Sequence, residues 1–286
     1  MKIKEHTFII TGGLGGIGKA VAKDFLSRGA KVALFDIVPE GKGTALAKEL
    51  HSTKAFYVHT DISDPESTKA AVEAVVETLG DLKGVVHCAG IAIKRPWSND
   101  IADSIPDFIK MLNVNTVGTF VINAQVADAI NKPLNHPEGS SADSASKFWT
   151  TDEERGVIIN FSSAAAHGLY ARTLGYGPTK AAVAGITRTL SDFLGPSGIR
   201  VNSISPSIVQ SVMTSNFLGY FGDDLLSHAA FPRRPVPVEE IVRTVVYLVE
   251  NGFINGEDVR VDSAWRLVTS RTPGGKDPRE LAPGLE

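Results

Sequence analysis

Short apolar runs alternate along this chain with longer amphipathic segments. Two of the runs, Val-Ala-Leu-Phe at 32–35 and Val-Ile-Ile-Asn-Phe at 157–161, are apolar almost without a break. Strands that are apolar on both faces are buried on both sides, as in parallel sheets covered by helices. Because strands and helices also alternate in sequence, we predict a single doubly wound α/β domain with a seven-stranded parallel sheet flanked by helices.

The apolar pattern also sets the expected boundaries of these elements. Strands are predicted at 6–11, 31–36, 54–60, 82–88, 155–161, 198–205 and 257–261, and helices at 16–28, 41–51, 65–78, 101–130, 174–194 and 238–250. No break marks a second domain, so the domain is predicted to cover 1–269. Residues 131–155 are polar and rich in Ser, Pro and charge, which predicts a surface insertion. Residues 270–286 are predicted to be a tail without a core.

Composition excludes several classes of protein. The formal net charge of −3 gives no electrostatic basis for nucleic-acid binding. Cys88 is the single cysteine, which excludes a disulfide framework and a cysteine-based zinc site and fits a reducing compartment. No apolar run reaches the roughly 18 residues of a membrane span, and the apolar run that begins at Phe8 leaves no room for a signal peptide. We therefore expect a cytoplasmic protein with no membrane span and no metal.

A glycine-rich turn follows the first predicted strand and opens the first predicted helix. It fits two registers, G-x-G-x-x-G from Gly13 and G-x-x-x-G-x-G from Gly12, Gly16 and Gly18. Glycine lets the backbone turn sharply and approach a pyrophosphate, which then lies at a helix N-terminus. Most glycine turns are only turns, but a position between strand and helix favours dinucleotide binding.

Acidic residues follow the second and third predicted strands. Asp36 ends the second strand, 18 residues after Gly18. A carboxylate there accepts hydrogen bonds from ribose hydroxyls and repels a 2′-phosphate, which favours NAD over NADP; the alternative is that it only ends the strand. Asp61 is placed to meet the adenine amine, although the run from Asp61 to Asp64 is equally suited to cap the next helix.

A tyrosine, a lysine and a serine form a possible proton-transfer group. Tyr176 and Lys180 are four residues apart and would share one face of a helix, with Ser163 thirteen residues earlier at a strand end. A nearby cation favours the charged form of a phenol, so Lys180 is expected to lower the pKa of Tyr176. A phenol tuned in this way can exchange a proton with an alcohol or a carbonyl. The Y-x-x-x-K pair alone is weak, because both residues are common on exposed helix faces.

Taken together, these motifs resemble the short-chain dehydrogenase/reductase family over about residues 6–265. The resemblance rests on the order Thr11 to Gly18, Asp61, Cys88-Ala89-Gly90, Asn115, Ser163, Tyr176 and Lys180. It implies a Rossmann-type fold. Further similarity points to the branch of type-2 3-hydroxyacyl-CoA dehydrogenases, which also oxidise hydroxysteroids; it lies in HCAGIA at 87–92, GVIIN at 156–160, AFP at 230–232 and ENGFINGE at 250–257.

The resemblance implies roles for particular residues. Tyr176 would be the general acid/base, Lys180 would lower its pKa and bind the nicotinamide ribose, and Ser163 would orient the substrate oxygen. Asn115 would hold a helix kink and a water that links Lys180 to solvent. Ser162 competes with Ser163 and Asn113 with Asn115, and spacing favours the second of each pair. The implied cofactor-binding set is Gly12, Leu14, Gly16, Ile17, Gly18, Asp36, Asp61, Ile62, Cys88, Ala89, Gly90, Tyr176, Lys180, Pro206, Ile208 and Ser211.

The chain departs from the family pattern at three places. His87 and Cys88 stand where the family has two asparagines, and Ser207 follows Pro206 where the family has glycine. Ser211 stands where a carboxamide-binding threonine is usual. His87 is either a proton-active group or, more simply, a satisfied histidine at a strand end. Cys88 is expected to be a small buried hydrophobe.

The substrate is expected outside the carboxyl ends of the strands, where the matching segments are 91–100, 164–172 and a lid at 208–232. Their apolar and aromatic residues suit a hydrophobic alcohol or ketone, and Arg95 and Arg172 are candidates for a polar or anionic group. The predicted substrate residues are Trp97, His167, Leu169, Phe217 and Phe221, and the wider apolar lining adds Ile91, Ile93, Tyr170, Leu218, Tyr220 and Phe231.

The function expected from this resemblance is an NAD(H)-dependent interconversion of a secondary alcohol and a ketone. The substrate would be a 3-hydroxyacyl-CoA, a hydroxysteroid or a similar hydrophobic molecule. Two alternatives stay open, a tailoring dehydrogenase of secondary metabolism and a non-redox binding or assembly protein. The family also implies a homodimer or homotetramer that packs the helices at 101–130 and 174–194.

Overall fold

The computed structural model describes residues 1–93, 100–132, 150, 152–168, 174–210 and 229–265. Its centre is a seven-stranded sheet in the order β3-β2-β1-β4-β5-β6-β7, and every neighbouring pair of strands is parallel. The strands are β1 (Thr7–Thr11), β2 (Lys31–Asp36), β3 (Ala55–His59), β4 (Leu82–His87), β5 (Gly156–Phe161), β6 (Ile199–Pro206) and β7 (Asp258–Val261). The predicted fold class is confirmed.

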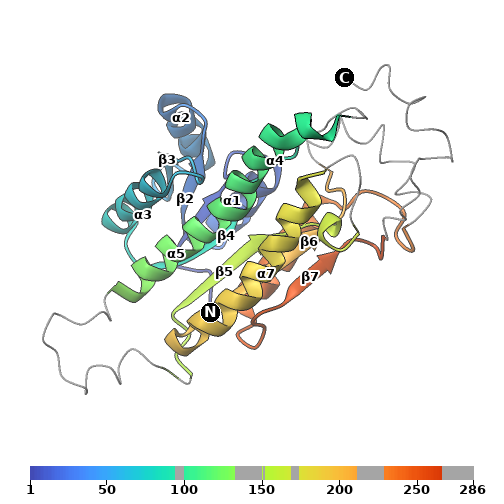
Figure 1. The fold of residues 1–286 in the computed structure, drawn as a ribbon. Coiled ribbons are helices and arrows are strands. Elements are labelled where there is room, and N and C mark those ends of the chain that lie inside the picture. The colour runs from blue at the N-terminus through green and yellow to red at the C-terminus, as the bar shows by residue number, and fades with distance from the viewer. Residues whose placement is uncertain (94–99, 133–149, 151, 169–173, 211–228, 266–286) are drawn as a thin grey trace, which may run out of the picture.

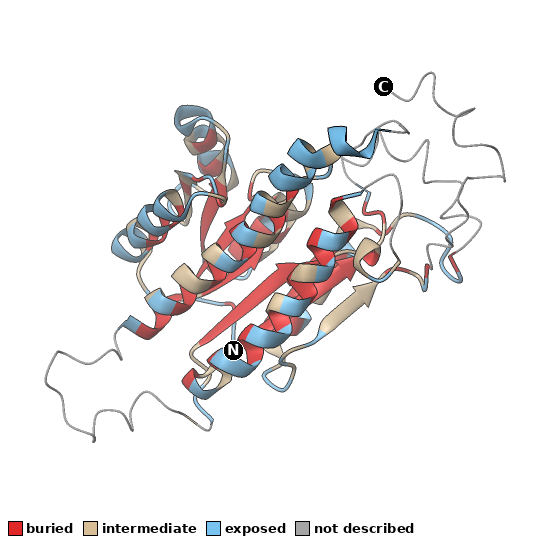
Figure 2. Ribbon diagram, viewed as in Figure 1, coloured by how far each residue is buried: buried red, intermediate tan, exposed pale blue. Residues whose placement is uncertain are grey.

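Helices cover both faces of this sheet (Figure 1). One apolar core packs α1 (Gly16–Ser27), α2 (Glu40–Leu50) and α9 (Val238–Glu250) against it, and a second packs α3 (Pro65–Leu79), α5 (Gly118–Asn131) and α7 (Tyr176–Leu194). Side chains alternate between the two cores along a strand, so Ile9 points to the second core and Ile10 to the first. Figure 2 shows the result, a buried sheet beneath helices whose outer faces are exposed.

The single helix predicted over 101–130 is divided into four segments. A 3-10 turn at Ile101–Ser104 leads into α4 (Ile105–Leu112), a π-helical segment follows at Asn113–Val117, and α5 begins at Gly118. Pro106 lies in the first turn of α4, where a missing N–H is tolerated. Thr119 Oγ1, in the first turn of α5, donates to Asn115 O in the π-helical segment at 2.6 Å. Such back-bonding competes with the helical ladder and bends helices.

The strand order places the site. The chain crosses from β3 at one edge back to β4 beside β1, which makes the gap between β1 and β4 the topological switch point where open α/β sheets bind ligands. The carboxyl ends of the strands, at Thr11, His87, Phe161 and Pro206, all meet at this edge of the sheet. In the part of the chain that the structure describes, no helix has the length and apolarity needed to cross a membrane.

The two described ends of the polar segment predicted at 131–155 pack against the rest of the domain. Asn131 is buried at the end of α5, and Glu154 Oε1 accepts from the Arg200 side chain at 2.6 Å. Residues 133–149 and 151, most of the predicted lid and the predicted tail at 270–286 lie outside the described residues.

Candidate active site

The glycine turn between β1 and α1 has closely packed glycines, and it leads into a helix N-terminus that no side chain caps. Gly12 has a φ of 58°, and a Cβ on Gly18 would lie 2.2 Å from Gly12 O, so side chains are excluded at both positions. A Cβ on Gly12 would also meet the backbone of Ala89 at 3.1 Å. Helix α1 begins without a side-chain cap and without an acidic residue in its first turn. Its free N–H groups are therefore available to a phosphate.

Asp36 is joined to this turn. Its Oδ2 accepts from Leu14 N at 3.1 Å, and its Oδ1 accepts from Ile37 N at 2.8 Å. The carboxylate is half-buried.

The alternatives for the run from Asp61 to Asp64 are separated by geometry. Asp64 caps α3 and accepts from Glu66 N at 3.0 Å. Asp61 is exposed, and its Oδ1 accepts from the backbone and the hydroxyl of Ser63. Ile62 is buried, and a Cβ on Gly118 would lie 3.1 Å from its side chain. The helix cap therefore belongs to Asp64, and Asp61 stays on the outer turn.

Asn115 lies at the centre of the π-helical segment and is completely buried. Its Oδ1 accepts from Ile91 N at 2.8 Å, and its Nδ2 donates to Ile91 O at 2.9 Å and to Thr179 Oγ1 at 3.1 Å. A Cβ on Gly90 would lie 3.2 Å from both Asn115 Oδ1 and Lys180 Nζ. The helix irregularity thus brings Asn115 and Lys180 together at the end of β4, while the competing Asn113 is exposed.

The two adjacent serines after β5 have different surroundings. Ser162 is buried, and its hydroxyl donates to Lys180 O at 2.8 Å. Ser163 is half-buried and accepts from Ala165 N at 3.1 Å, and its side chain acts to lower the pKa of the Tyr176 phenol. Lys180 Nζ donates to Phe161 O at 2.7 Å and lies 5.8 Å from the centroid of the Tyr176 ring. Of the two serines, Ser163 is therefore the one that shares a site with Tyr176.

The expected lowering of the Tyr176 pKa by Lys180 is wrong for this structure. Burial raises the pKa of Tyr176, and the hydrogen bond from Ser163 is the influence that lowers it. Burial also lowers the pKa of Lys180 to about 8, against the opposing effect of Cys88. The Lys180 ammonium donates its hydrogen bond to Phe161 O and not to the phenol oxygen of Tyr176.

His87 is a satisfied histidine. Its Nδ1 lies 2.7 Å from Thr11 Oγ1, and its Nε2 lies 3.0 Å from Thr119 Oγ1. Burial, followed by the charge of Lys180, lowers the pKa of His87 to about 3, so the ring is neutral at physiological pH. Burial likewise raises the pKa of the Cys88 thiol, which keeps it protonated and unreactive.

The end of β6 carries the serine that departs from the family pattern. Ser207 N donates to Val261 O at 3.1 Å, but the buried Ser207 hydroxyl has no hydrogen-bond partner among the described residues. Ile208 is buried in a small cluster with Ala164 and Trp265. A buried hydroxyl without a partner is unfavourable, and this one follows the strand next to β5, which leads to Ser163.

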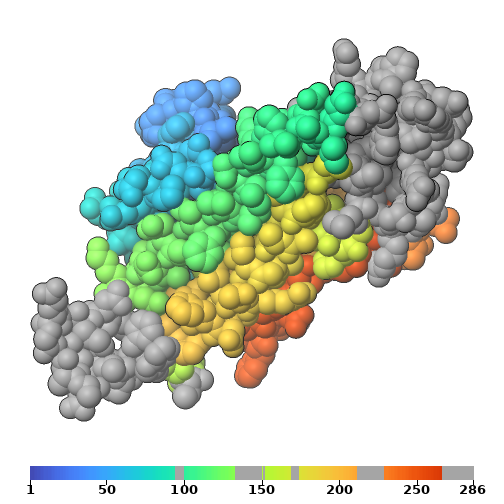
Figure 3. Space-filling model, in the orientation of Figure 1, coloured from blue at the N-terminus to red at the C-terminus, as the bar shows by residue number. Residues whose placement is uncertain are grey.

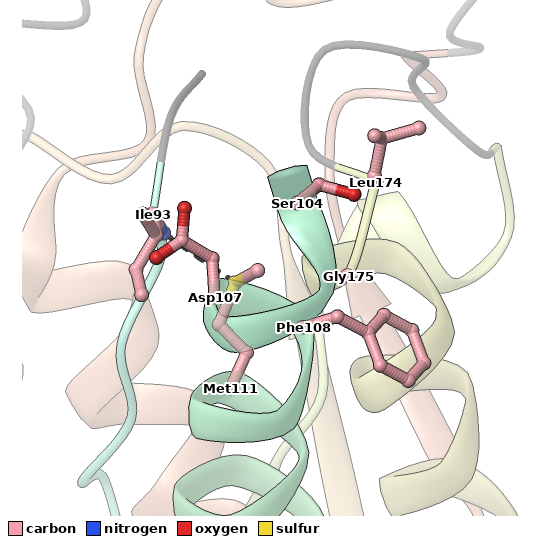
Figure 4. Close-up of a pocket in the computed structure, with 7 residues that line it drawn as sticks. All are labelled: Ile93, Ser104, Asp107, Phe108, Met111, Leu174 and Gly175. Carbon is pink, nitrogen blue, oxygen red and sulfur yellow. Dashed lines mark hydrogen bonds between the residues drawn. The ribbon is translucent and has the colours of Figure 1, made fainter. Parts of the chain in front are cut away.

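A small open hollow of roughly 250 Å³, partly continuous with solvent, lies beside the start of α7 (Figure 4). Met111 and Ile93 form one side, with Ile93 N donating to Met111 Sδ at 3.4 Å. A Cβ on Gly175, the residue before Tyr176, would lie 2.6 Å from Met111 Cε. The full lining is Ile93, Ser104, Asp107, Phe108, Met111, Leu174 and Gly175. The predicted residue Ile93 is therefore placed in an apolar hollow next to Tyr176.

The remaining predicted substrate residues divide into three groups. His167 is described, and its Nε2 is engaged by Asp258 at 2.7 Å. Phe231 is 84% exposed and lines no hollow that the structure describes. The predictions for Arg95, Trp97, Leu169, Tyr170, Arg172, Phe217, Leu218, Tyr220 and Phe221 lie outside the described residues, as does that for the predicted cofactor-binding residue Ser211.

Three threonines that sequence reasoning missed organise the site. Thr11 Oγ1 accepts from Ala89 N at 3.1 Å, Thr119 joins His87 to Asn115, and Thr179 joins Asn115 to the Tyr176 carbonyl. Their positions inside or next to recognised motifs were the only signal available. Among the described residues, no group of three or more His, Cys, Asp or Glu side chains could hold a metal ion.

Comparison with known proteins agrees with this geometry. Residues 6–218 match the family model described as short chain dehydrogenase. The chain is 32% identical over 269 residues to a 3-hydroxyacyl-CoA dehydrogenase type-2 from Drosophila melanogaster, covering 93% of this chain and 99% of the relative. It is 34% identical over 256 residues to a 3-alpha-(or 20-beta)-hydroxysteroid dehydrogenase from Mycobacterium bovis, covering 89% and 86%.

A solved structure shows the same relationship. The crystal structure of 3-hydroxyacyl-CoA dehydrogenase type-2 from Mycobacterium avium matches with a TM-score of 0.77 and 28% identity, over 94% of this chain and 99% of that one. The resemblance to this branch is thereby confirmed. The chain belongs to the short-chain dehydrogenase/reductase family and is an oxidoreductase that acts on CH–OH groups.

Proposed function

We propose that this protein is an NAD(H)-dependent dehydrogenase that interconverts a secondary alcohol and a ketone on a hydrophobic substrate. The observation that carries the proposal is the convergence of Ser163, Tyr176 and Lys180 beside the open N-terminus of α1. The sheet's topological switch point puts the glycine turn and these three residues at one edge.

Tyr176 is the residue that moves the proton. Its phenol gives a proton to the carbonyl oxygen in reduction and takes one from the hydroxyl in oxidation. Ser163 holds the same substrate oxygen and, through its bond to the phenol, opposes the effect of burial on the Tyr176 pKa. Since that pKa is raised, oxidation of the alcohol is expected to gain rate as the pH rises, because the basic form of Tyr176 is the phenolate.

The residues present fit a nicotinamide dinucleotide. The uncapped start of α1 with Gly12, Gly16 and Gly18 suits the pyrophosphate. Asp36 would accept from the adenosine ribose, and the Ser207 hydroxyl, which has no partner in the described part of the chain, would be available to the nicotinamide end. When bound, the nicotinamide supplies the hydride chemistry.

The substrate class follows from the lining of the hollow and from the relatives. Ile93, Phe108 and Met111 offer an apolar wall next to the residue that precedes Tyr176. Two relatives are named for 3-hydroxyacyl-CoA and hydroxysteroid substrates. We propose one of these two classes or a similar hydrophobic alcohol.

We further propose a homodimer or homotetramer in the cytoplasm. The outer surfaces of α4, α5 and α7 lie side by side in Figure 3. They carry exposed apolar side chains, which favour burial against another copy; these include Ile105, Phe108, Ile109, Phe120 and Phe193. The unpaired Cys88 fits a reducing compartment.

Replacement of Tyr176 tests the reaction. Tyr176→Phe removes only the phenol oxygen, and turnover of hydroxyacyl-CoA or steroid substrates is expected to fall about 1,000-fold. Binding of NADH, followed by its fluorescence, should be retained. Tyr247→Phe, at an exposed tyrosine of α9, is the matched control and should be unchanged. Substantial activity in Tyr176→Phe would refute the role of Tyr176 in proton transfer. If the wild type does not bind NADH, the alternative of a non-redox binding or assembly protein is favoured.

Replacement of Asp36 tests the cofactor. Asp36→Asn removes the charge that repels a 2′-phosphate, so the preference for NAD over NADP in titrations should shrink by about tenfold. Asp64→Asn, which alters the cap of α3, should leave this preference unchanged. A wild type that binds NADP as tightly as NAD would contradict the proposal.

A further inference from the structure

A buried carboxylate lies at the outer edge of the sheet, away from the glycine turn. Asp258 is the first residue of β7, and its side chain is only 2% exposed. Ser203 Oγ donates to its Oδ1 at 2.6 Å, and Ser205 Oγ lies 2.9 Å and 2.8 Å from its two oxygens. Hydroxyls satisfy its hydrogen bonds but carry no charge, and a buried charge is costly without a partner of opposite sign.

His167 is the partner that the fold supplies. Its Nε2 lies 2.7 Å from Asp258 Oδ2 and 3.2 Å from Ser205 Oγ, and its side chain is 26% exposed. Of the ionic groups nearby in β7, Arg260 is directed to Asp262. The described salt bridge of Asp258 is therefore with a residue that comes from the segment after β5.

His167 directly ends the turn that begins at Ser163. Ser163 is the N-cap of a 3-10 turn at Ala164–Ala166, in which Ala166 N donates to Ser163 O at 2.9 Å. His167 is the C-cap, and its N donates to Ala164 O at 3.0 Å. Three residues thus separate Ser163 from His167, the residue that contacts Asp258, and the turn between them is internally hydrogen-bonded.

We propose that Asp258 and His167 form a positioning pair that anchors this turn to strands β6 and β7 and so holds the Ser163 hydroxyl in place beside Tyr176. Neither residue of the pair touches the reacting atoms; both act through Ser163. The inference rests on the proposed function, because it takes Ser163 and Tyr176 to be the groups that handle the substrate oxygen.

If the turn at Ala164–Ala166 moves, the pKa of Tyr176 should change, whereas a general loss of stability should leave that pKa as it is. The Ser163 hydrogen bond lowers the pKa of Tyr176, and burial raises it. Weakening that bond leaves burial unopposed, so the phenolate forms at higher pH. Lys180, whose Nζ lies 5.8 Å from the centroid of the Tyr176 ring, is not altered by this change. The group that faces His167 is Asp258.

The test is the pH profile of alcohol oxidation by the full-length His167→Leu variant with NAD. The rise of kcat/KM with pH should move to higher pH, and kcat/KM near neutral pH should fall about tenfold, mainly through kcat. The dissociation constant for NADH should be unchanged. His167→Gln, which keeps a neutral donor near Asp258, should recover part of the loss. A wild-type pH profile in His167→Leu, whatever its melting temperature, overturns the proposal.

Two further variants keep the test decisive. Ser203→Ala removes a hydrogen bond from the same carboxylate without touching the turn, so its pH profile should match the wild type. If His167→Leu does not fold, Asp258→Asn keeps the shape of the pair and removes its charge, and should shift the profile in the same direction. An unshifted Asp258→Asn profile would then reject the pair.

Ser163→Ala separates this inference from the proposed function. If Ser163→Ala keeps wild-type kinetics, the proposed role of Ser163 fails. If Ser163→Ala is impaired while His167→Leu keeps the wild-type profile, only the positioning pair fails.

Discussion

Two histidines near the carboxyl ends of the strands are held in different ways. His87, at the end of β4, lies between two threonine hydroxyls and is 1% exposed. His167, after β5, lies against the carboxylate of Asp258. Hydroxyl partners satisfy both nitrogens of a neutral ring, whereas a carboxylate binds a protonated ring more strongly than a neutral one. The threonines therefore hold the His87 ring in one orientation in its neutral form. The strength of the contact between His167 and Asp258 depends instead on whether the His167 ring is protonated.

Both arrangements belong to one polar row across the sheet. Thr11, His87, Asn160, Ser203 and Asp258 are successive register partners on β1, β4, β5, β6 and β7. Paired residues of neighbouring strands point to the same face. His87 and Asn160 bond to hydroxyls, as Asn160 Nδ2 does to Thr187 Oγ1 at 3.1 Å. Ser203 instead donates to the carboxylate of Asp258, the acidic member of the row.

The largest expected effect concerns acid and the neutral ring of His87. Its pKa is lowered from 6.5 to about 3, so the unfolded chain binds the proton first as the pH falls. Stability should therefore be lost progressively between pH 6.5 and pH 3, by up to about 5 kcal/mol from this group. Urea unfolding at a series of pH values should show a shallower loss in His87→Gln. Parallel curves for the two proteins would mean that His87 is not buried in its neutral form.

The next effect concerns the histidine–aspartate pair at the edge. His167→Leu leaves the buried carboxylate of Asp258 without its contact to His167 Nε2 and should lower the free energy of unfolding by about 3 kcal/mol. The double variant His167→Leu/Asp258→Val replaces both partners by apolar groups and should recover most of that loss. Thermal unfolding of the four proteins in the cycle measures the coupling. If the double variant is as unstable as the single one, the contact between the two side chains does not stabilise the fold.

The smallest effect concerns one hydroxyl of the inner cluster. Thr119→Val keeps the shape of the side chain but leaves His87 Nε2 without a partner, so we expect a loss of about 1 to 2 kcal/mol in urea unfolding. Thr116→Val removes a longer contact of 3.4 Å to Thr179 O at a half-buried position and should have a smaller effect. Equal losses in the two variants would show that the hydrogen bond between Thr119 and His87 contributes no more to stability than the longer contact of Thr116.

The sequence predicted the elements that depend on local patterns. All seven strands lie within a residue or so of their predicted limits, because buried strands such as 157–161 are apolar throughout. The glycine turn, Asp36 and the group formed by Ser163, Tyr176 and Lys180 are recognisable because their spacing along the chain is itself the motif.

Features that depend on distant contacts could not be predicted. Asp258 lies 91 residues after His167, and nothing in either local sequence indicates the other. The pKa of Tyr176 was misjudged because spacing on a helix says that Lys180 is near but not where its ammonium points. The division of the helix at 101–130 depends on side-chain bonds of Asn115 to Ile91 and Thr179, which no helical periodicity reveals.

The π-helical segment at Asn113–Val117 sets the angular phase between two stretches of helix. Each residue of an α-helix turns the chain by about 100°, and a π-helical turn accommodates one residue more than an α-helical turn. Deletion of one residue here would restore an unbroken α-helix and rotate α4 by about 100° against α5. Met111 would then face away from Ile93, and Phe108 would face away from the residue before Tyr176. An irregular turn in one helix thus fixes the direction in which Phe108 and Met111 face relative to the start of α7.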